Sequence, residues 1–483
     1  MAHISPARKA AFNILLAVER GHSHSDDLLR GKAVNALSAP DRNLATALVL
    51  GVLRWQIQLD HQIRALLSRP NAKLEPEILI ALRLGAFQLL HMDRIPARAA
   101  IDESVELAKQ AGNYFASGMV NAVLRKLAKT PQTANSLDQV RIVNTEGGGG
   151  FNPRNQPTVS AGALAPDNYS SEELALAQAH PAWMVERWIN FYGIDAARAI
   201  CRHGQSQPAL TVRLTSQAVE AELRAAGINL EPGQLLTVAR VVVSGDVTST
   251  AAFLEGRARL QDEGSQLVAE LTSENPGQKV TIILDCCAAP GGKTLILAER
   301  NPEARIVTME SSAPRLEQLQ NRLALHAARI ECRLADATAL TEDSVFDLAL
   351  ADVPCSGTGT LDRNPEIRHR LRPEDLARQA ERQRAILASA LRAVRPGGCV
   401  VYSTCSLEPE ENEQVVVDVL AATLNARQVS LAPRIETLLR ADILTENGTQ
   451  RLRGSLTPEG ALRLLPGAFY TDGFYIALIE RIA

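Results

Sequence analysis

The chain has 483 residues, of which 46% are hydrophobic, and its formal net charge is −3. That length is enough for two to four compact domains. The near-neutral balance excludes a protein that binds nucleic acid through basic character spread over its whole surface. No stretch approaches the roughly 18 apolar residues of a membrane span, and Met1–Lys9 lacks the apolar core of a signal peptide. We therefore expect a soluble protein of the cytoplasm.

The seven cysteines are predicted to be reduced thiols. Their number is odd and they show no paired Cys-x-x-Cys spacing, which argues against a disulfide framework and against a zinc ribbon. No cluster of histidine, cysteine and carboxylate residues has the spacing of metal ligands. We therefore expect no metal.

Residues 1–130 are predicted to form an all-α bundle. Their apolar residues recur at helical spacing, as Leu44, Leu48 and Val52 do. Three prolines mark helix boundaries, namely Pro40, Pro76 and Pro96. A helical bundle alone does not distinguish RNA binding from a structural docking role.

Residues 131–168 are predicted to be a flexible linker, because Gly147–Gly150 and Asn152–Pro157 follow one another with few apolar positions between them. A small α+β module is predicted for residues 169–271. In that module Arg213 stands in the strand-like run Leu210–Leu214 before a helical pattern. Arg213 could reach RNA from there, although it could equally be solvated at a sheet edge.

Residues 272–483 are predicted to form a Rossmann-like α/β domain. Val280–Leu284 has the pattern of a buried strand, and it runs through the turn Asp285–Thr294 into a helix. A P-loop would require glycine where Cys287 stands, and a dinucleotide fingerprint would require three spaced glycines, whereas Gly291 and Gly292 are adjacent. Adjacent glycines let the backbone approach a ligand that has no pyrophosphate.

The next two predicted strands each end in an acidic residue. Glu310 follows Arg305–Met309, where a Rossmann-like fold places an acceptor for ribose hydroxyls. Asp336 follows Glu331–Ala335 and is placed to accept from an adenine amino group. This set suits a nucleoside without phosphates, such as S-adenosylmethionine, although both residues could instead be solvated loop carboxylates. The run Phe474–Ile482 is expected to add a final antiparallel strand.

Two cysteine motifs lie where a hydrophobic run meets a turn. Cys355 belongs to Ala351–Gly359, and Cys405 belongs to Ser403–Ser406, which Pro409–Asn412 follows. Both thiols are therefore predicted at the carboxyl edge of a parallel sheet, where α/β proteins bind ligands. Each thiol taken singly could be an inert, buried one. The pair together with the nucleoside-binding turn indicates chemistry.

The segments Asp285–Thr294, Asp352–Gly359 and Thr404–Asn412 resemble motifs I, IV and VI of RNA 5-methylcytosine methyltransferases. Nearly the whole chain is similar to the RsmB (Sun) branch of that family, which methylates one cytosine of 16S ribosomal RNA. The resemblance implies a NusB-like RNA-binding bundle, a small α+β RNA-binding module and a class I methyltransferase domain that uses S-adenosylmethionine. It also implies ribosomal RNA as the partner, either naked or in a partly assembled small subunit, and we expect a monomer.

The resemblance also implies roles for individual residues. Cys405 would attack carbon 6 of cytosine, because carbon 5 is too weak a nucleophile until a thiolate has been added next to it. Cys355 would assist release of the methylated base, and Asp352 would hydrogen-bond the cytosine edge. Lys293 could steady the thiolate or could be a surface lysine. The implied cofactor-binding residues are Cys287, Ala288, Ala289, Pro290, Gly291, Gly292, Lys293, Glu310, Asp336 and Asp352.

Four residues depart from the family pattern. Glu310 stands where aspartate is usual, Cys286 and Val353 stand where leucine and alanine are more common, and His369 stands where tryptophan is common. Contact with RNA phosphates is expected from four arginines, Arg363, Arg368, Arg370 and Arg372, which could equally be solvated.

Two other functions stay open. The same chemistry could act on another RNA such as transfer RNA, or the chain could be a non-catalytic RNA-binding assembly or antitermination factor.

Overall fold

The computed structural model describes residues 4–21, 24–130, 170–273 and 279–482. The predicted linker, residues 131–168, lies outside this part of the chain. The internal contacts divide the chain into two units, and the first one draws on two separate stretches of sequence. We call them the helical unit, Met1–Gln207 with Leu361–Arg370, and the sheet unit, Pro208–Thr360 with Leu371–Ala483.

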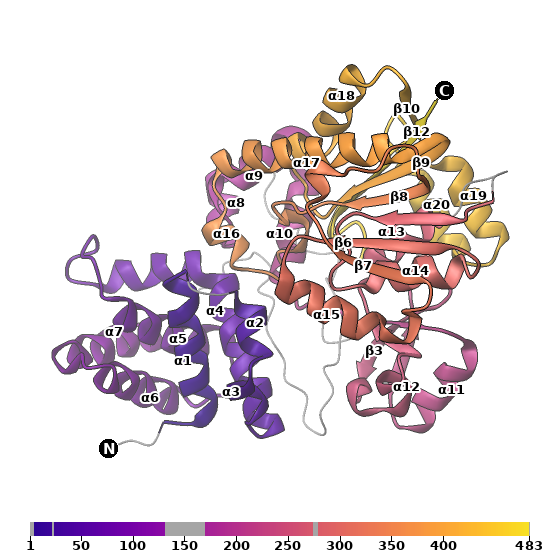
Figure 1. Ribbon diagram of the computed structural model, residues 1–483. Coiled ribbons are helices and arrows are strands. Elements are labelled where there is room, and N and C mark those ends of the chain that lie inside the picture. Colours follow the sequence, from indigo (N-terminus) through magenta and orange to yellow (C-terminus); the bar gives the residue numbers. More distant parts are fainter. Residues whose placement is uncertain (1–3, 22–23, 131–169, 274–278, 483) are drawn as a thin grey trace. The chain divides into compact units, whose positions relative to one another are not determined.

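The helical unit begins with the all-α bundle that the sequence predicts (Figure 1). Its helices are α1 (Pro6–Glu19), α2 (Ser25–Leu29), α3 (Lys32–Asn35), α4 (Ala39–Leu66), α5 (Pro76–His91), α6 (Ala97–Gln110) and α7 (Ser117–Lys129). Leu48, Val52 and Phe87 are fully buried in the core between them. The helical spacing of apolar residues places these side chains on the inward faces, and their burial stabilises the bundle.

Four more helices belong to the helical unit, namely α8 (Ser171–Ala177), α9 (Ala182–Tyr192), α10 (Ile194–Gln205) and the short α16 (Ile367–Arg370). The N-terminus of α8 is closed by a capping box in which Ser170 and Glu173 satisfy one another's backbone amides. Trp188 of α9 is fully buried. The helices α8, α9 and α10 fall in the first part of the region predicted as an α+β module, residues 169–271.

The sheet unit contains two sheets. The smaller one has four antiparallel strands in the order β2 (Asn229–Pro232), β3 (Ala239–Ser244), β1 (Thr211–Leu214) and β4 (Ala258–Leu260). The helices α11 (Gln217–Ala225) and α12 (Ala251–Leu254) pack with this sheet around Val212 and Leu223. The predicted α+β character of this region is confirmed.

The larger sheet carries the candidate site. Its strand order is β10 (Ala426–Val429), β12 (Phe474–Arg481), β9 (Val394–Thr404), β8 (Phe346–Asp352), β5 (Ile282–Asp285), β6 (Arg305–Glu310) and β7 (Ile330–Leu334), and β11 (Leu462–Leu464) pairs with β12. The five strands from β9 to β7 are parallel, and β12 is antiparallel to β9, as expected. The Rossmann-like prediction is therefore confirmed.

Helices cover both faces of the larger sheet (Figure 1). One face packs against α13 (Glu263–Thr272), α14 (Gly292–Arg300), α15 (Ala313–Leu323), α19 (Ala432–Arg440) and α20 (Glu446–Arg453), and the other packs against α17 (Pro373–Ala393) and α18 (Glu413–Ala422). Successive residues of a strand point to opposite faces, so Ile283 enters one core and Leu284 the other. Because both faces of these strands are buried, their sequences are continuous hydrophobic runs in which apolar and polar residues do not alternate.

Candidate active site

The two cysteine motifs meet at the carboxyl ends of neighbouring strands. Asp352, the last residue of β8, pairs in register with Ser403 of β9. The loops that follow these strands bring the Sγ atoms of Cys355 and Cys405 to 3.3 Å, within hydrogen-bond distance for two thiols. Both thiols are free and partly buried. Two residues fifty positions apart in the sequence thus form one pair, as their placement at strand ends predicts.

Direct backbone contact holds the two loops together. The amide of Gly359 donates to the Cys405 carbonyl at 2.9 Å, and the amide of Gly473 donates to the Gly359 carbonyl at 2.8 Å. A Cβ atom at position 359 would lie 2.7 Å from the Gly473 carbonyl oxygen. Only glycine permits this approach, which accounts for the glycine in the first cysteine motif.

Glu411 holds both cysteine loops through hydrogen bonds, although no role was predicted for it. Its buried carboxylate accepts hydrogen bonds from the Ser356 amide at 2.9 Å, the Ser406 hydroxyl at 2.5 Å and the Gln383 amide at 2.9 Å. The Tyr402 hydroxyl donates to the Glu411 carbonyl. Buried carboxylates require such donors. The signal in the sequence was the acidic motif directly after Cys405.

A charged pair lies beside the thiols. Lys293 Nζ and Asp352 Oδ2 are 2.7 Å apart, and the Ser403 hydroxyl donates to Asp352 Oδ1 at 2.7 Å. Lys293 Nζ also lies 5.5 Å from the centre of the Phe474 ring. The Lys293 side chain is only 15% exposed. The alternative in which Lys293 is a surface lysine at the helix start is therefore wrong.

The surroundings of these groups shift their protonation in definite directions. Burial lowers the pKa of Lys293, but the adjacent Asp352 carboxylate and the charge on Cys405 outweigh it, so the pKa is raised and the ammonium is retained. The hydrogen bond with the Cys405 sulfur, then burial, raise the pKa of Cys355 well above that of a free thiol. Cys355 therefore keeps its proton near neutral pH.

The turn after β5 is closely packed at its two glycines. Gly291 has φ +93°, and a Cβ there would lie 2.9 Å from Leu319. A Cβ on Gly292 would lie 3.3 Å from the Gln261 side chain. The Ala288 amide donates to the Met309 carbonyl at 3.0 Å and the Gly291 amide to the Ala288 carbonyl at 2.7 Å. The two glycines therefore let the turn pack closely against neighbouring parts of the protein.

The two predicted nucleoside acceptors lie at the ends of β6 and β7. Glu310 is 5% exposed, and one of its oxygens accepts from the Ser312 amide at 2.9 Å. Asp336 is exposed and accepts from the Thr338 amide at 3.0 Å, a bond that lowers the pKa of Asp336. A hollow of about 540 Å³ lies beside Asp336 and is lined by Met309 and by residues 333–336 and 339–342. Its size lies in the range of small-molecule sites.

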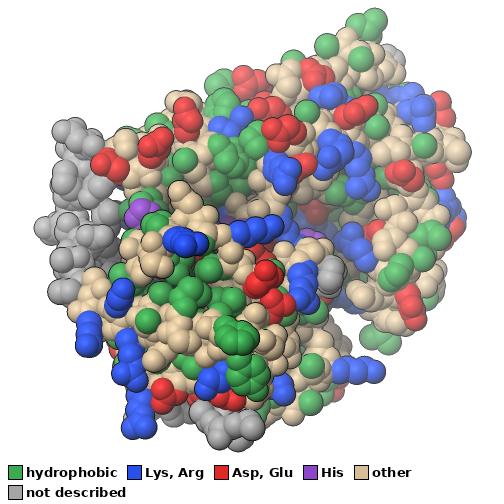
Figure 2. Space-filling model, turned by 90° about the vertical axis from the view of Figure 1, so that its left-hand side faces the viewer, with side chains coloured by type: hydrophobic (Ala, Val, Ile, Leu, Met, Phe, Trp, Pro, Cys, Tyr) green, Lys and Arg blue, Asp and Glu red, His purple; other side chains and the backbone are tan. Residues whose placement is uncertain are grey.

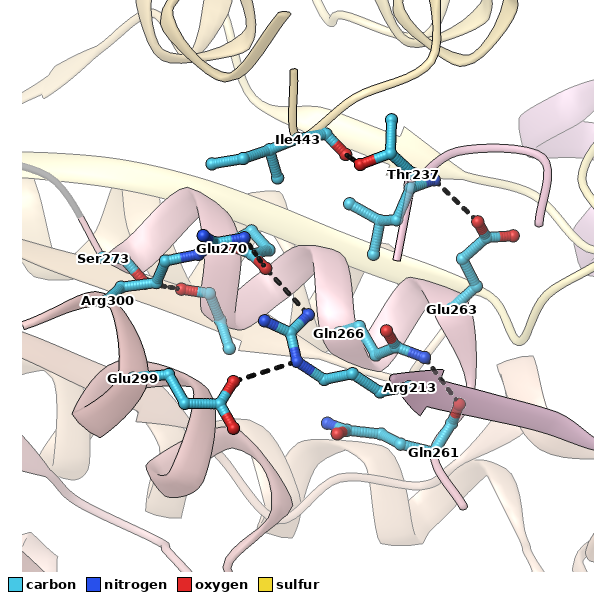
Figure 3. Close-up of polar contacts among 12 residues, drawn as sticks. Arg213, Thr237, Gln261, Glu263, Gln266, Glu270, Ser273, Glu299, Arg300 and Ile443 are labelled. Carbon is cyan, nitrogen blue, oxygen red and sulfur yellow. Dashed lines mark hydrogen bonds and ion pairs between the residues drawn. The ribbon is translucent and has the colours of Figure 1, made fainter. Parts of the chain in front are cut away.

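Arg213 is not available to RNA (Figure 3). Its side chain is 3% exposed, and its guanidinium lies 2.8 Å from Glu270 and 3.2 Å from Glu299. Glu270 is fully buried and also pairs with Arg300 at 2.7 Å. Arg213 therefore joins β1 to α13 and α14, and the suggestion that it reaches RNA is wrong.

Arg368 is also buried, within the helical unit, where it donates only to backbone carbonyls. The expectation that it contacts RNA phosphates is wrong as well, because its guanidinium does not reach the surface. Arg370 donates to the Val18 carbonyl at 3.0 Å, and Arg372 is exposed. On the face drawn in Figure 2, basic side chains are interspersed with acidic ones, so that face offers no large basic field.

The described residues contain no group of three or more histidine, cysteine or acidic side chains that could hold a metal ion. Within the same ranges, none of the helices has both the length and the apolar character that crossing a bilayer requires.

Three parts of the sequence match known protein families. Residues 272–480 match the family described as 16S rRNA methyltransferase RsmB/F, residues 5–129 match the NusB family, and residues 180–245 match the RsmF/B-like ferredoxin-like domain. These matches fall on the larger sheet, on the helical bundle and on the region of the smaller sheet. Each module of the predicted architecture therefore contains a match to a known family.

Full-length relatives and a solved structure extend the likeness. The chain is 32% identical to the probable ribosomal RNA small subunit methyltransferase B of Bacillus subtilis over 98% of both chains, and 30% identical to the corresponding Pseudomonas putida methyltransferase over 99% of this chain and 98% of that one. A methyltransferase homologue from Pyrococcus horikoshii matches with a TM-score of 0.52 at 25% identity, covering 66% of this chain and all of that one. The chain therefore belongs to the RsmB/F family of S-adenosylmethionine-dependent 16S rRNA methyltransferases.

Proposed function

We propose that this methyltransferase modifies carbon 5 of a cytosine through a covalent adduct between Cys405 and carbon 6 of the base. The observation that carries the proposal is the 3.3 Å approach of the Cys355 and Cys405 sulfurs at the ends of β8 and β9. One thiol can attack the base while the other handles the proton that has to leave. A single buried cysteine could not perform both steps.

The proposed reaction begins when the Cys405 thiolate adds to carbon 6 and forms a carbon–sulfur bond. Carbon 5 then has the electron density of an enamine and can take a methyl group. Bound S-adenosylmethionine would supply that group, its methyl carbon–sulfur bond breaking to leave the neutral thioether S-adenosylhomocysteine. Cys355 relays the carbon 5 proton: its thiol passes its own proton to solvent as it takes up the proton from carbon 5. The electron pair of that C–H bond restores the 5,6 double bond and expels the Cys405 thiolate.

The surrounding residues support this division of labour. Cys355, which keeps its proton, can donate a hydrogen bond to the Cys405 sulfur. Lys293 adds a positive charge that Cys405 feels electrostatically. Asp352 lies at the end of β8, where its carboxylate can hydrogen-bond the cytosine edge and favour a proton on ring nitrogen 3.

The cofactor would be held by the residues predicted for it. The turn Cys287–Gly292 would offer backbone contacts, Glu310 would accept from the ribose hydroxyls, and Asp336 would accept from the adenine amino group at the hollow beside it. Lys293 and Asp352 would stand between this cofactor site and the thiols. This assignment is supported by the positions of Glu310 at the end of β6 and of Asp336 just after β7.

The proposed substrate is a cytosine of 16S rRNA, naked or in a partly assembled small subunit. The names of the Bacillus and Pseudomonas relatives support ribosomal RNA as the substrate class. The NusB-family match supports an RNA-binding role for residues 1–130. Together with the proposed linker 131–168, the matched ranges support a module at 169–271 and a methyltransferase domain at 272–483. We propose that the protein acts as a cytoplasmic monomer.

Two single-atom substitutions test the mechanism. Cys405→Ser should abolish both methylation and the covalent protein–RNA adduct, because a serine hydroxyl is scarcely ionised near neutral pH. Cys355→Ser should methylate once and remain attached to the RNA. Denaturing electrophoresis with labelled 16S rRNA measures the adduct, and bisulfite sequencing of the same RNA locates the methylated cytosine.

Cys332→Ser is the matched control, because Cys332 is a free, partly buried thiol on β7 outside the pair. It should methylate as the unaltered protein does. An adduct that accumulates in Cys405→Ser and is absent from Cys355→Ser would exchange the two roles. Methylation of a transfer RNA transcript but not of 16S rRNA would contradict the proposed substrate, and no methylation of any RNA would favour a non-catalytic RNA-binding protein.

A further inference from the structure

A ten-residue segment couples the first cysteine loop to the helical unit. Leu361–Arg370 belongs to the helical unit, although the chain before it, up to Thr360, and the chain after it, from Leu371, belong to the sheet unit. The segment starts directly after Thr358–Gly359–Thr360, the end of the motif that carries Cys355. Any force on the segment therefore reaches that motif through a single peptide bond.

Arg368 anchors the segment inside the helical unit. Its guanidinium donates hydrogen bonds to the carbonyls of Arg54 at 3.1 Å, Ala179 at 3.2 Å, Gly204 at 3.0 Å and Leu361 at 3.3 Å. These carbonyls come from α4, from the turn after α8, from α10 and from the start of the segment itself. One planar side chain with five donors can bridge four such carbonyls, and no other residue type can.

Two further contacts hold the same segment. Glu366 is 1% exposed, and its carboxylate accepts hydrogen bonds from the amide and the hydroxyl of Ser25, at the start of α2. His369 Nε2 donates to the Leu53 carbonyl of α4 at 2.7 Å. The buried Glu366 carboxylate is costly to leave unpaired, so the segment is held to one conformation as long as the helical unit is folded.

Both ends of the segment connect to groups that position the thiols within the sheet unit. On the N-terminal side, the backbone amide of Gly359 donates a hydrogen bond to the Cys405 carbonyl. On the C-terminal side, the chain enters α17, from which the Gln383 amide donates to the Pro354 carbonyl at 2.9 Å, next to Cys355. The segment is thus bracketed by contacts to both cysteine loops.

We propose that Arg368 is a positioning residue for the reaction: by fixing Leu361–Arg370 to the helical unit, it sets the conformation of the loop that presents Cys355 to Cys405. This inference rests on the proposed function for its catalytic consequence. It also makes the helical unit part of the catalytic apparatus in addition to any RNA contact. The role of Arg368 is conformational, since its guanidinium donates its hydrogen bonds to carbonyls of the helical unit.

The charge of Arg368 supports this reading. Burial, and next the nearby Arg54 guanidinium, lower the pKa of Arg368 to about 9, and the carbonyl cage contains no carboxylate that pairs with it directly. Holding a guanidinium in such a place costs stability. A residue that merely filled the space could be apolar at lower cost, so the arginine is explained by the four contacts that it orients.

Arg368→Met tests the proposal in the full-length protein, because methionine fills a similar space without donors. We expect kcat on 16S rRNA to fall by about 10- to 100-fold, the effect of misplacing a catalytic group by roughly 1 Å. The KM for RNA and the calorimetric affinity for S-adenosylmethionine should remain unchanged. Arg368→Lys, which keeps the charge but cannot bridge four carbonyls, should recover part of the loss.

A second measurement needs neither RNA nor cofactor. The rates at which iodoacetamide alkylates Cys355 and Cys405, followed by mass spectrometry, should change relative to one another in Arg368→Met. If the unaltered protein methylated no RNA, the proposed function would fail, while this ratio would still decide whether Arg368 positions the loop. Ser25→Ala, which weakens the hold on Glu366, provides a milder variant should Arg368→Met not fold.

Arg83→Met is the matched control. Arg83 is another buried arginine of the helical unit, but its partners are Asp60 and Glu19, outside the segment. It should lower the stability of the helical unit, measured by tryptophan fluorescence, and leave kcat and the alkylation ratio at their original values. Equal effects of Arg368→Met and Arg83→Met on kcat and alkylation, or no effect of either, would show that Arg368 is only structural and overturn the proposal.

Discussion

At the scale of single residues, Glu310 has a side chain one methylene longer than the aspartate that is usual at this position. The longer side chain keeps its carboxylate at the end of β6, where one oxygen accepts from the Ser312 amide and the other lies 3.4 Å from Arg315. Each carboxylate oxygen has a second acceptor position. Glu310 can therefore still accept from ribose hydroxyls while these two contacts keep its charge in place.

Glu310→Ala should weaken the binding of S-adenosylmethionine by about 1–3 kcal/mol, because a hydrogen bond to a charged acceptor is lost. Isothermal titration calorimetry on the full-length protein measures this change. Glu317→Ala, on the exposed side of α15, is the control and should leave affinity as it was. Unaltered affinity in Glu310→Ala would reject the ribose assignment.

At the scale of elements, a buried ion cluster joins the two sheets of the sheet unit. Arg213 of β1 and Arg259 of β4 pair with Glu299 of α14, while Glu270 of α13 pairs with Arg213. Figure 3 shows Arg213 pointing between the two glutamates. The cluster joins the smaller sheet to α13 and α14, helices that also pack on the larger sheet.

Arg213→Met should destabilise the sheet unit by about 3–5 kcal/mol, because it leaves the fully buried Glu270 with only one of its two arginines. Urea unfolding followed by circular dichroism measures the loss. Arg257→Met is the control, since Arg257 makes ion pairs with Glu222 and Glu255 at the surface of the same module, and it should change stability little. Weaker RNA binding with unaltered stability in Arg213→Met would contradict a structural role.

The elements themselves could be predicted from the sequence, whereas their charged contacts could not. Strands such as Ile282–Asp285 can be predicted from hydrophobic runs that end in turns. The carboxyl ends of neighbouring parallel strands lie at the same edge of the sheet. The partners of Arg213 and Arg368 lie far away in the sequence, so neither residue differed from a solvated arginine until the chain was folded. Glu411 was hidden for the same reason.

At the scale of the whole molecule, the two units can be monitored separately. All three tryptophans, Trp55, Trp183 and Trp188, lie in the helical unit. Tryptophan fluorescence therefore reports unfolding of that unit, while activity and thiol reactivity report on the sheet unit. This separation makes it possible to assign a change in stability to one part of the chain.

The helical unit should lose stability as the pH falls from about 6.5 to 4. Burial lowers the pKa of His91 to about 4 and that of His369 to about 3, and it lowers that of His180 well below the ordinary value. The unfolded chain then binds more protons than the folded one in this range, so acid favours unfolding. His91 alone should contribute about 3 kcal/mol.

Urea unfolding followed by tryptophan fluorescence between pH 7 and pH 4 measures this dependence. His91→Phe, which keeps an aromatic ring stacked against Trp55, should flatten part of the curve without lowering stability at pH 7. Substitution of the exposed His61 by glutamine is the control and should leave the slope as it was. A curve that is equally steep with and without His91 would show that this imidazole titrates normally in the folded protein.

The interrupted sequence of the helical unit has a consequence for its biosynthesis. When the ribosome has completed Gln207, the helices up to α10 exist, but the arginine that binds the Arg54, Ala179 and Gly204 carbonyls has not been translated. Those carbonyls remain hydrated until Arg368 leaves the exit tunnel, after most of the parallel strands. The amino-terminal helices are therefore finished late in translation, and a gene fragment that stops at Gln207 encodes an incomplete module.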